Sequence, residues 1–226
     1  MNRSDNIHSK HPIQLIIFDF DGTLCDSQAI IVKTLQMTQA ELGYSVSSDE
    51  ACAATIGLPL PNCFMQLLPQ ISKDTADNCA ACYRRIFEEN KKVAFPPLFP
   101  HVMETIRTMH KKGIRMAIAT SRVQISLMRF VERYEMTPYM EICIGSDNVV
   151  NPKPAPDPVL YILEKTGIAA ENTLVVGDMT FDILMGLRAG THTCGVTYGN
   201  GTKQELTDCK AEFIIDDFAQ LNEWIG

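Results

Sequence analysis

QLIIFDFDGTLCDS, residues 14–27, begins as an apolar run and ends among carboxylates. The run at 15–18 is typical of a strand that is buried on both faces, as in a parallel sheet. Strand side chains alternate with period two, so Asp19 and Asp21 point the same way if strand geometry continues that far. Two carboxylates at the end of a buried strand are unfavourable unless positive charge lies beside them. We therefore expect a cation at this edge of the sheet.

Length, charge and cysteine content limit the class of protein. The 226 residues suffice for one large α/β domain or two smaller domains, and 46% hydrophobic with 21% charged residues is ordinary for a globular chain. A formal charge of -7 and a pI near 5.2 argue against nucleic acid or an anionic membrane as a partner. No apolar stretch reaches the length of a membrane span, and we interpret residues 1–12 as a flexible polar lead-in, not a secretory signal. Eight scattered cysteines favour a reducing, cytoplasmic location.

The segment that follows the first strand is predicted to be entirely helical. Helical patterns occur at about 27–42, 48–56, 60–68 and 73–92, with a stiff Gly/Pro loop at 57–61. FPPLFP, 95–100, then ends this helical part of the chain.

Beyond residue 100, strand patterns alternate with helical patterns. Strands are expected at 114–120, 141–145, 173–178, 192–196 and 212–216, and helices at 102–113, 124–136, 157–167, 182–190 and in the tail. This alternation predicts an α/β fold with a doubly wound, Rossmann-like parallel sheet, to which the strand at 14–19 must also belong. We therefore predict a core formed by 13–25 and 96–226, with 26–95 inserted as an all-helical cap.

Polar residues follow four of the predicted strands, at the ends where parallel sheets bind ligands. They are Asp19 and Asp21, Thr120 and Ser121, Lys153, and Asp178 and Asp182. Carboxylates together with phosphate oxygens suit Mg²⁺, while lysine and hydroxyl groups neutralise and orient phosphoryl oxygens. One carboxylate can attack phosphorus to form an aspartyl-phosphate, and a second acid nearby can protonate the leaving oxygen.

Each of these residues also has a purely structural interpretation. An Asp-x-Asp-Gly sequence alone is often a turn or a calcium-like loop, and a Thr-Ser pair after a strand is often a helix N-cap. Lys153 could be a solvated loop lysine, and Asp178 could cap a helix that carries Asp182 on its exposed face. We prefer the functional interpretation because all of them fall at one edge of one sheet.

The motifs resemble those of the haloacid dehalogenase superfamily, in particular its phosphoglycolate phosphatase-like branch with a helical, C1-type cap. FDFDGTLCDS at 18–27 resembles the first motif, AIATS at 117–121 the second, KPAPDP at 153–158 the third and VVGDMTFDI at 175–183 the fourth. The resemblance covers nearly the whole chain after the first dozen residues. It implies a Mg²⁺-dependent phosphatase that hydrolyses a small phosphorylated metabolite through an aspartyl-phosphate.

The same resemblance assigns roles to the strand-end residues. It implies that Asp19 is the nucleophile and Asp21 the general acid and base. Thr120, the Ser121 amide and Lys153 are expected to bind the transferring phosphoryl group. Dehalogenating members lack an acid two residues after the nucleophile, so Asp21 favours phosphate chemistry over carbon–halogen cleavage.

The expected Mg²⁺ ligands come from the resemblance as well. They are Asp19, the main-chain carbonyl of Asp21 and Asp178, with Asp182 in support. Met179 stands where related sequences often carry Ser or Thr, so we expect a supporting hydrogen bond to be missing there.

The substrate depends on the cap and is the least predictable feature. Phosphoglycolate is the leading candidate, and an inorganic pyrophosphatase or a β-phosphoglucomutase-like phosphoryl transferase are the enzymatic alternatives. A phospho-accepting regulatory domain uses similar groups, but the acid pair and the cap argue against it, and the intact motif acids disfavour an inactive binding protein. We expect a monomer or homodimer.

Several residues of the cap and its border have open roles. An anionic leaving group could meet cap cations, although each is more often a solvated helix residue: Lys33, Lys73, Arg84 and Arg85. Cys79 and Cys82 form a CxxC inside a predicted helix, without a second ligand pair, and are interpreted as packing residues. His101 replaces a glycine common in related sequences and is interpreted as a surface residue near the hinge.

Overall fold

The core of the protein is a six-stranded sheet, seen in a computed structural model that describes residues 12–93 and 95–223. Its strand order is β3-β2-β1-β4-β5-β6, and every neighbouring pair is parallel. The strands are β1 Leu15–Phe18, β2 Arg115–Ala119, β3 Ile142–Ile144, β4 Thr173–Gly177, β5 His192–Val196 and β6 Phe213–Ile215. The predicted doubly wound parallel sheet is confirmed. The predicted lead-in, 1–12, lies outside the described residues except for Pro12.

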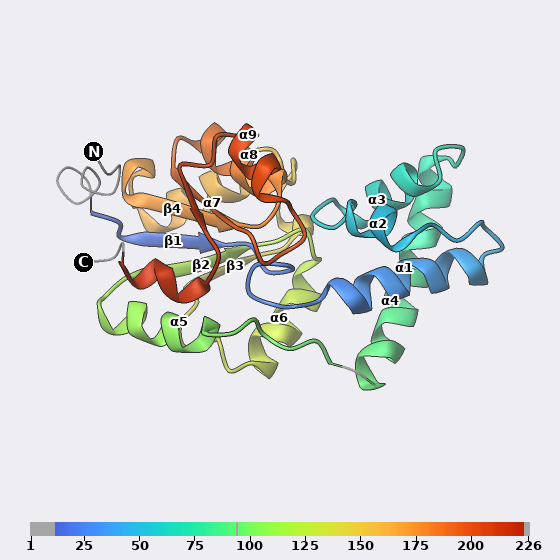
Figure 1. Ribbon diagram of the computed structural model, residues 1–226, viewed down its shortest axis with the longest axis horizontal. Coiled ribbons are helices and arrows are strands. Elements are labelled where there is room, and N and C mark those ends of the chain that lie inside the picture. Colours follow the sequence, from blue (N-terminus) through green and yellow to red (C-terminus); the bar gives the residue numbers. More distant parts are fainter. Residues whose placement is uncertain (1–11, 94, 224–226) are drawn as a thin grey trace.

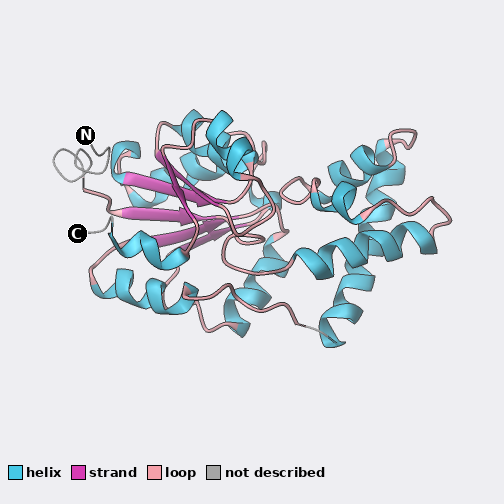
Figure 2. Ribbon diagram, viewed as in Figure 1, coloured by secondary structure: helices cyan, strands magenta, loops and turns pink. Residues whose placement is uncertain are grey.

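Helices cover both faces of this sheet (Figures 1 and 2). Ile16 and Phe18 of β1 belong to one apolar cluster, whereas Leu15 and Ile17 belong to a second cluster. This alternation is what a strand buried on both faces requires. The first cluster includes side chains of α5 and α6, and the second includes side chains of α7 and α8; these helices are Val102–Lys111, Gln124–Arg133, Asp157–Thr166 and Thr180–Ala189.

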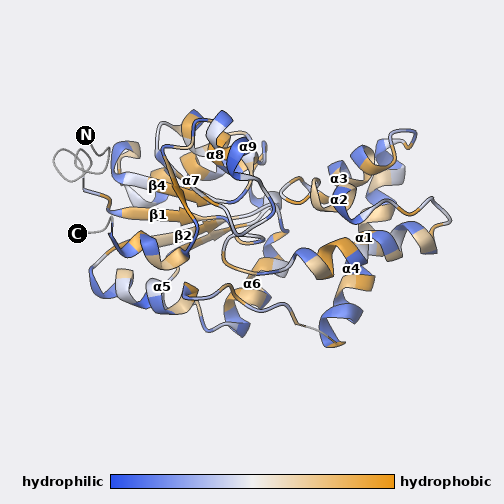
Figure 3. Ribbon diagram, viewed as in Figure 1, coloured by the Kyte–Doolittle hydropathy of each residue, from blue (hydrophilic) through white to orange (hydrophobic). Residues whose placement is uncertain are grey.

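The cap consists of four helices inserted between β1 and β2, and they lie together at one end of the molecule, beside the sheet (Figure 1). They are α1 Gln28–Glu41, α2 Asp49–Ala53, α3 Leu60–Leu67 and α4 Lys73–Val93. Each overlaps a helix predicted from the sequence. Tyr83 packs on Phe64 and Phe87 within the cap, and Phe87 also contacts Phe130 of the core at 6.3 Å between ring centroids. The cap therefore shares its apolar packing with the core. Figure 3 shows hydrophobic residues on the cap helices α1 and α4 and on strands of the core.

The C-terminal part departs from the predicted elements in two places. α9, Lys203–Asp208, was not expected, although Thr202 and Glu205 form a capping box that marks its start. The expected tail helix is a 3₁₀ helix, η4 Phe218–Glu223, and two further 3₁₀ turns are η2 Ser146–Asn148 and η3 Ala170–Asn172. Among the described residues, no helix has the length and apolar character of a membrane span. All eight cysteines are free.

Candidate active site

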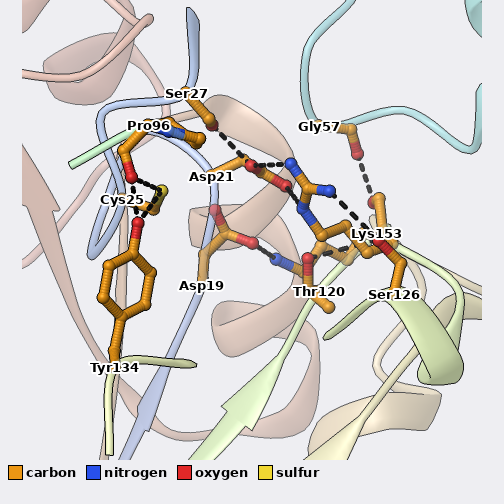
Figure 4. Close-up of polar contacts among 12 residues, drawn as sticks. Asp19, Asp21, Cys25, Ser27, Gly57, Pro96, Thr120, Ser126, Tyr134 and Lys153 are labelled. Atoms are coloured by element: carbon orange, nitrogen blue, oxygen red, sulfur yellow. Dashed lines mark hydrogen bonds and ion pairs between the residues drawn. The ribbon is translucent and has the colours of Figure 1, made fainter. Parts of the chain in front are cut away.

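Asp19 lies where β1 ends at the centre of the sheet, and Lys153 reaches it from the loop before α7. The main-chain amide of Asp19 still donates to the carbonyl of Val176 in β4, which continues the sheet by one residue. Lys153 Nζ donates to Asp19 Oδ1 at 2.5 Å (Figure 4). Both side chains are buried, with relative exposures of 3% for Lys153 and 5% for Asp19. The sequence-based expectation of positive charge beside Asp19 is confirmed.

Two more carboxylates complete a buried cluster around Asp19. Lys153 Nζ also donates to Asp182 Oδ1 at 2.6 Å. Oxygen atoms of Asp19, Asp178 and Asp182 all lie within 4.8 Å of one another. Asp178 accepts hydrogen bonds from Thr23 Oγ1 at 3.0 Å and from the main chain and side chain of Asn200 at 2.7 and 2.8 Å. These bonds fix the carboxylate that carries no ion pair to Lys153.

Two glycines allow these carboxylates to approach the backbone. Gly22 has φ +88°, and a Cβ there would lie 2.1 Å from Asp178 Oδ2. A Cβ at Gly177 would lie 2.2 Å from Asp182 Cβ. Such separations are far below van der Waals contact, so a side chain at either position would displace an acid of the cluster.

The charges of the cluster do not balance. Burial raises the pKa of Asp19 well above its usual value; Lys153 opposes this effect, while Asp182 and Asp178 add to it. Burial and the nearby Asp182 raise the pKa of Asp178 to about 7, against the hydrogen bonds from Asn200 and Thr23. Burial lowers the pKa of Lys153, but Asp182 and Asp19 outweigh burial and raise it overall. One lysine is therefore insufficient for three buried carboxylates, and a further cation would relieve their repulsion.

A divalent cation with a preference for oxygen fits this cluster. The three carboxylates are hard oxygen donors, and Mg²⁺ needs only one or two of them because it retains waters and binds substrate phosphate. Of the expected ligands, the cluster contains Asp19, Asp178 and Asp182. The carboxylate of Asp21 is not part of it.

Asp21 instead has its own cation, Arg122. Arg122 Nε donates to Asp21 Oδ2 and Arg122 Nη2 to Oδ1, both at 2.6 Å, and Ser27 Oγ donates to Oδ1 at 2.5 Å (Figure 4). The two carboxylates of the first motif therefore contact different cations, Lys153 and Arg122. Strand alternation suggested one shared cation, but the sheet pairing of β1 reaches only as far as Asp19.

Arg122 was missed in the sequence, although it follows β2 at the same sheet edge. Its guanidinium carbon lies 4.5 Å from the ring centre of Phe130 and 5.0 Å from that of Phe87. Stacking on aromatic faces and a two-pronged bond to a carboxylate are the conditions under which arginine is stable in a buried site. Phe87 belongs to the cap, so Arg122 connects the acid of the core to the cap.

Thr120 and Ser121 follow β2 directly and line the same cavity. Thr120, 5% exposed, follows β2, and its Oγ1 accepts from the amide of Arg122 at 3.2 Å. Ser121 Oγ donates to the carbonyl of Gly57 in the cap loop at 2.5 Å (Figure 4). The Ser121 side chain thus attaches the cap loop to the core, a role the sequence did not suggest.

A cavity of about 250 Å³ lies between the core and the cap. Its core lining includes Asp19, Asp21, Thr120, Ser121 and Arg122. Lys153, Asp178 and Asp182 are not on the lining, so Asp19 is the member of the acid cluster that reaches the cavity. The arrangement places a buried carboxylate, paired with its lysine, on the lining of a partly open cavity, together with a second carboxylate.

The four cap cations differ in whether they reach the cavity. Of the four cap cations, only Arg84 lines the cavity, whereas Arg85 pairs with Glu41 and Glu89 on the surface. Lys33 and Lys73 are exposed and lie outside the cavity lining.

The two cysteines of α4 and His101 lie outside the cavity lining. Cys79 is buried within α4, and Cys82 Sγ donates to Glu41. His101 Nδ1 lies 2.9 Å from Asp217 Oδ1 at the surface. The main-chain amide of Met179 donates to Asp182 Oδ2 at 3.0 Å. Asp182 therefore receives a hydrogen bond without a hydroxyl side chain at position 179.

A family model described as haloacid dehalogenase-like hydrolase matches residues 16–196. Among curated proteins, "Probable phosphatase IndB" of Dickeya dadantii is 34% identical over 209 residues, covering 92% of this chain and 91% of that protein. "Phosphoglycolate phosphatase" of Vibrio parahaemolyticus is 28% identical over 224 residues, covering 96% and 98%. "Pyrophosphatase PpaX" of Oceanobacillus iheyensis is 28% identical over 216 residues, covering 95% and 97%.

The fold is also found among solved structures. A Bacteroides fragilis protein described as haloacid dehalogenase-like hydrolase superposes with a TM-score of 0.84 at 28% sequence identity, covering 92% of this chain and 99% of that one. The coverage includes both the sheet and the cap.

Proposed function

This chain belongs to the haloacid dehalogenase-like hydrolases, and on that premise we propose that it is a Mg²⁺-dependent phosphatase of a phosphate monoester. The observation that carries the proposal is the pairing of Asp19 with Lys153 at the base of the cavity, in contact with the acid cluster. A carboxylate that faces a cavity with a lysine at 2.5 Å is placed to attack an anionic group that the lysine helps to neutralise.

The proposed reaction has two steps. An oxygen of Asp19 attacks phosphorus, the bond between phosphorus and the ester oxygen breaks, and the departing alkoxide takes a proton from Asp21. For this step Asp21 has to bind a proton and leave its ion pair with Arg122. Water then attacks the aspartyl-phosphate, Asp21 takes a proton from that water, and Asp19 and inorganic phosphate are released. Asp21 is suited to this double role because its carboxylate lines the same cavity as Asp19.

The other residues bind and orient the phosphoryl group. Lys153, the Thr120 hydroxyl and the Ser121 amide are proposed to hold its oxygens. Asp19 and Asp178, with Asp182, are proposed to hold Mg²⁺, which when bound neutralises phosphoryl charge and lets two anions approach. The cap restricts water at the cavity, a condition that strengthens these electrostatic contacts.

The relatives supply two specific candidates for the substrate, phosphoglycolate and pyrophosphate. A β-phosphoglucomutase-like transferase and a phospho-accepting regulatory domain remain the alternatives. A second carboxylate in the cavity favours hydrolysis over stable phosphorylation, because it can activate water. The cytoplasmic location and the monomeric or homodimeric state remain predictions.

The test is phosphate release from a panel of phosphorylated metabolites and pyrophosphate, with Mg²⁺ or with EDTA. We expect release that requires Mg²⁺ and is lost in Asp19→Asn. Turnover in Asp19→Asn equal to the wild type would exclude the nucleophile assignment. A persistent phosphorylated protein without turnover would favour the regulatory alternative.

A further inference from the structure

The cap gives the cavity a mainly apolar lining. Its contributions include Ile56, Leu58, Leu60 and Phe87, and the start of α6 adds Ile125. Apolar walls of this kind bind the carbon skeleton of a ligand, while a few polar groups orient it. The apolar lining therefore favours a carbon-rich alcohol as the leaving group.

Two arginines of the cavity lining are already paired. Arg122 is bound to Asp21 through two nitrogens, and Arg129 at the edge pairs with Glu88 at 3.2 Å. Arg84 is the remaining lining cation among the described residues, and it is exposed. A second anionic group buried close to the ester oxygen, as in phosphoglycolate or pyrophosphate, would find no unpaired cation on the buried part of the described lining. Such burial is unfavourable.

The cavity also exceeds the size of these two anions. One water molecule needs roughly 10–15 Å³ measured in this way, so about 250 Å³ accommodates a body many times larger. A glycolate or phosphate leaving group would leave much of the apolar wall in contact with water.

Tyr83 adds one polar requirement. Its side chain lines the cavity and the residue is 9% exposed. No partner for its hydroxyl is found among the residues that the structure describes. The hydroxyl is not among the atoms that are buried without a partner, so water can reach it from the cavity. An occupant that displaces this water is expected to offer a hydrogen-bonding group in its place.

We propose that the substrate is a phosphate monoester of an alcohol with an apolar, carbon-rich body, such as an aromatic ring, that carries one hydrogen-bonding group for Tyr83. The inference rests on the proposed function and specifies its substrate class. It places phosphoglycolate and pyrophosphate among the poorer substrates.

The test compares kcat/KM with Mg²⁺ for ethyl, butyl and 2-phenylethyl phosphate, whose alcohols are similar leaving groups. Burying one methylene group increases affinity roughly fourfold. We expect kcat/KM to rise at least tenfold along this series and to be higher for 2-phenylethyl phosphate than for phosphoglycolate or pyrophosphate. The reverse order overturns the inference but leaves a functioning phosphatase. Acetyl phosphate is a small, activated acyl phosphate, so its cleavage reports phosphoryl transfer without any contact to an apolar body. If neither acetyl phosphate nor any of the esters is cleaved, the proposed function is overturned, and the inference with it.

Two matched variants test whether an apolar side chain of the cavity lining contacts the substrate. Ile125, 65% exposed, lines the cavity, whereas Leu160, 48% exposed, lies on α7 outside the lining. Ile125→Ala is expected to lower kcat/KM more for 2-phenylethyl than for ethyl phosphate, and Leu160→Ala is expected to match the wild type. An equal loss on both esters in Ile125→Ala contradicts an apolar contact.

Tyr83 is tested with the three pyridyl isomers of 2-phenylethyl phosphate, which place a hydrogen-bond acceptor at each ring position. At least one isomer is expected to exceed the phenyl ester in wild type and to lose this advantage in Tyr83→Phe. The absence of any advantage, or an advantage that persists in Tyr83→Phe, contradicts the role of the hydroxyl.

Discussion

Arg122 is the residue through which the acid of the first motif contacts the cap. The side chains of Arg122 and Asp21 are 10% and 12% exposed, so their ion pair is almost fully removed from water. Arg122→Met leaves the Asp21 carboxylate with Ser27 as its remaining side-chain partner among the described residues. Removing one partner of a buried pair typically lowers the free energy of unfolding by about 3 kcal/mol. We expect a loss of that size in urea denaturation.

Matched variants separate the ion pair from general effects of the substitution. Arg129→Met removes an arginine that is 53% exposed and pairs with Glu88, so its effect should stay within about 0.5 kcal/mol. Adding Asp21→Asn to Arg122→Met should recover part of the stability, because the buried charge is removed. If both single arginine variants lose the same stability, the buried pair is not what stabilises this region.

His101 gives the surface a pH-dependent contact. It is the N-cap residue of α5, with φ +64°, and hydrogen bonding to Asp217 and the charge of Asp217 raise the pKa of His101. A histidine whose pKa is raised on folding stabilises the protein below its unfolded pKa, and this contribution is lost as pH rises through the folded pKa. His101→Asn should therefore be less stable than wild type near pH 5.5, with a difference that disappears by about pH 8.5. Asparagine is the suitable replacement because it tolerates positive φ. A difference that does not vary with pH would show that the pair contributes nothing.

The strand-end residues could be predicted because their positions follow from local pattern alone. Asp19, Thr120 and Asp178 each follow an apolar run, and parallel strands bring such ends to one edge. Arg122 could not be predicted in the same way. Its burial depends on Phe87 and Phe130, which lie on α4 and α6, and nothing near Arg122 in the sequence indicates that they converge.

Among the elements, the cap loop at Gly57 determines how the cap contacts the core. Gly57 has φ +99°, its carbonyl accepts from Ser121, and an added Cβ would lie 3.1 Å from Phe181. Gly57→Ala should lower the free energy of unfolding by about 1–2 kcal/mol through backbone strain, and should also raise KM, because the loop must move away from Phe181.

Gly43→Ala is the matched control for this prediction. Gly43 also has a positive φ, +76°, but a Cβ there would meet nothing within 4 Å. Its stability loss should be similar, while KM should stay at the wild-type value. Equal KM values for the two variants would mean that the loop position does not affect substrate binding.

Helix α9 shows the limit of periodicity as a signal for elements. At six residues it is too short to display an apolar stripe, and only Leu206 is buried. The long helices of the cap and the alternating strands were predictable because their patterns repeat several times. The 3₁₀ form of η4 likewise depends on packing, since Phe218 contacts Phe18 of β1 at 5.5 Å between ring centres.

For the whole molecule, the buried acid cluster connects folding stability, pH and metal binding. An acid whose pKa is raised on folding favours the folded state when it is protonated, so this contribution is lost as pH rises through the folded pKa. For Asp178 that pKa is about 7, which implies that, without metal, the cluster destabilises the protein at pH 8 relative to pH 6.

Mg²⁺ should reverse this effect, because it competes with protons for the same oxygens. At a hundredfold excess over Kd, binding to the folded state adds about 2.7 kcal/mol, which corresponds to a Tm increase of roughly 5–10 °C for a chain of this size. We expect a larger increase at pH 8 than at pH 6, measured by thermal denaturation with Mg²⁺ against NaCl of equal ionic strength. Asp178→Asn should remove the increase, yet be at least as stable as wild type without metal at pH 8, because one buried charge is gone. An equal Tm increase at both pH values, or in Asp178→Asn, would show that Mg²⁺ binds elsewhere.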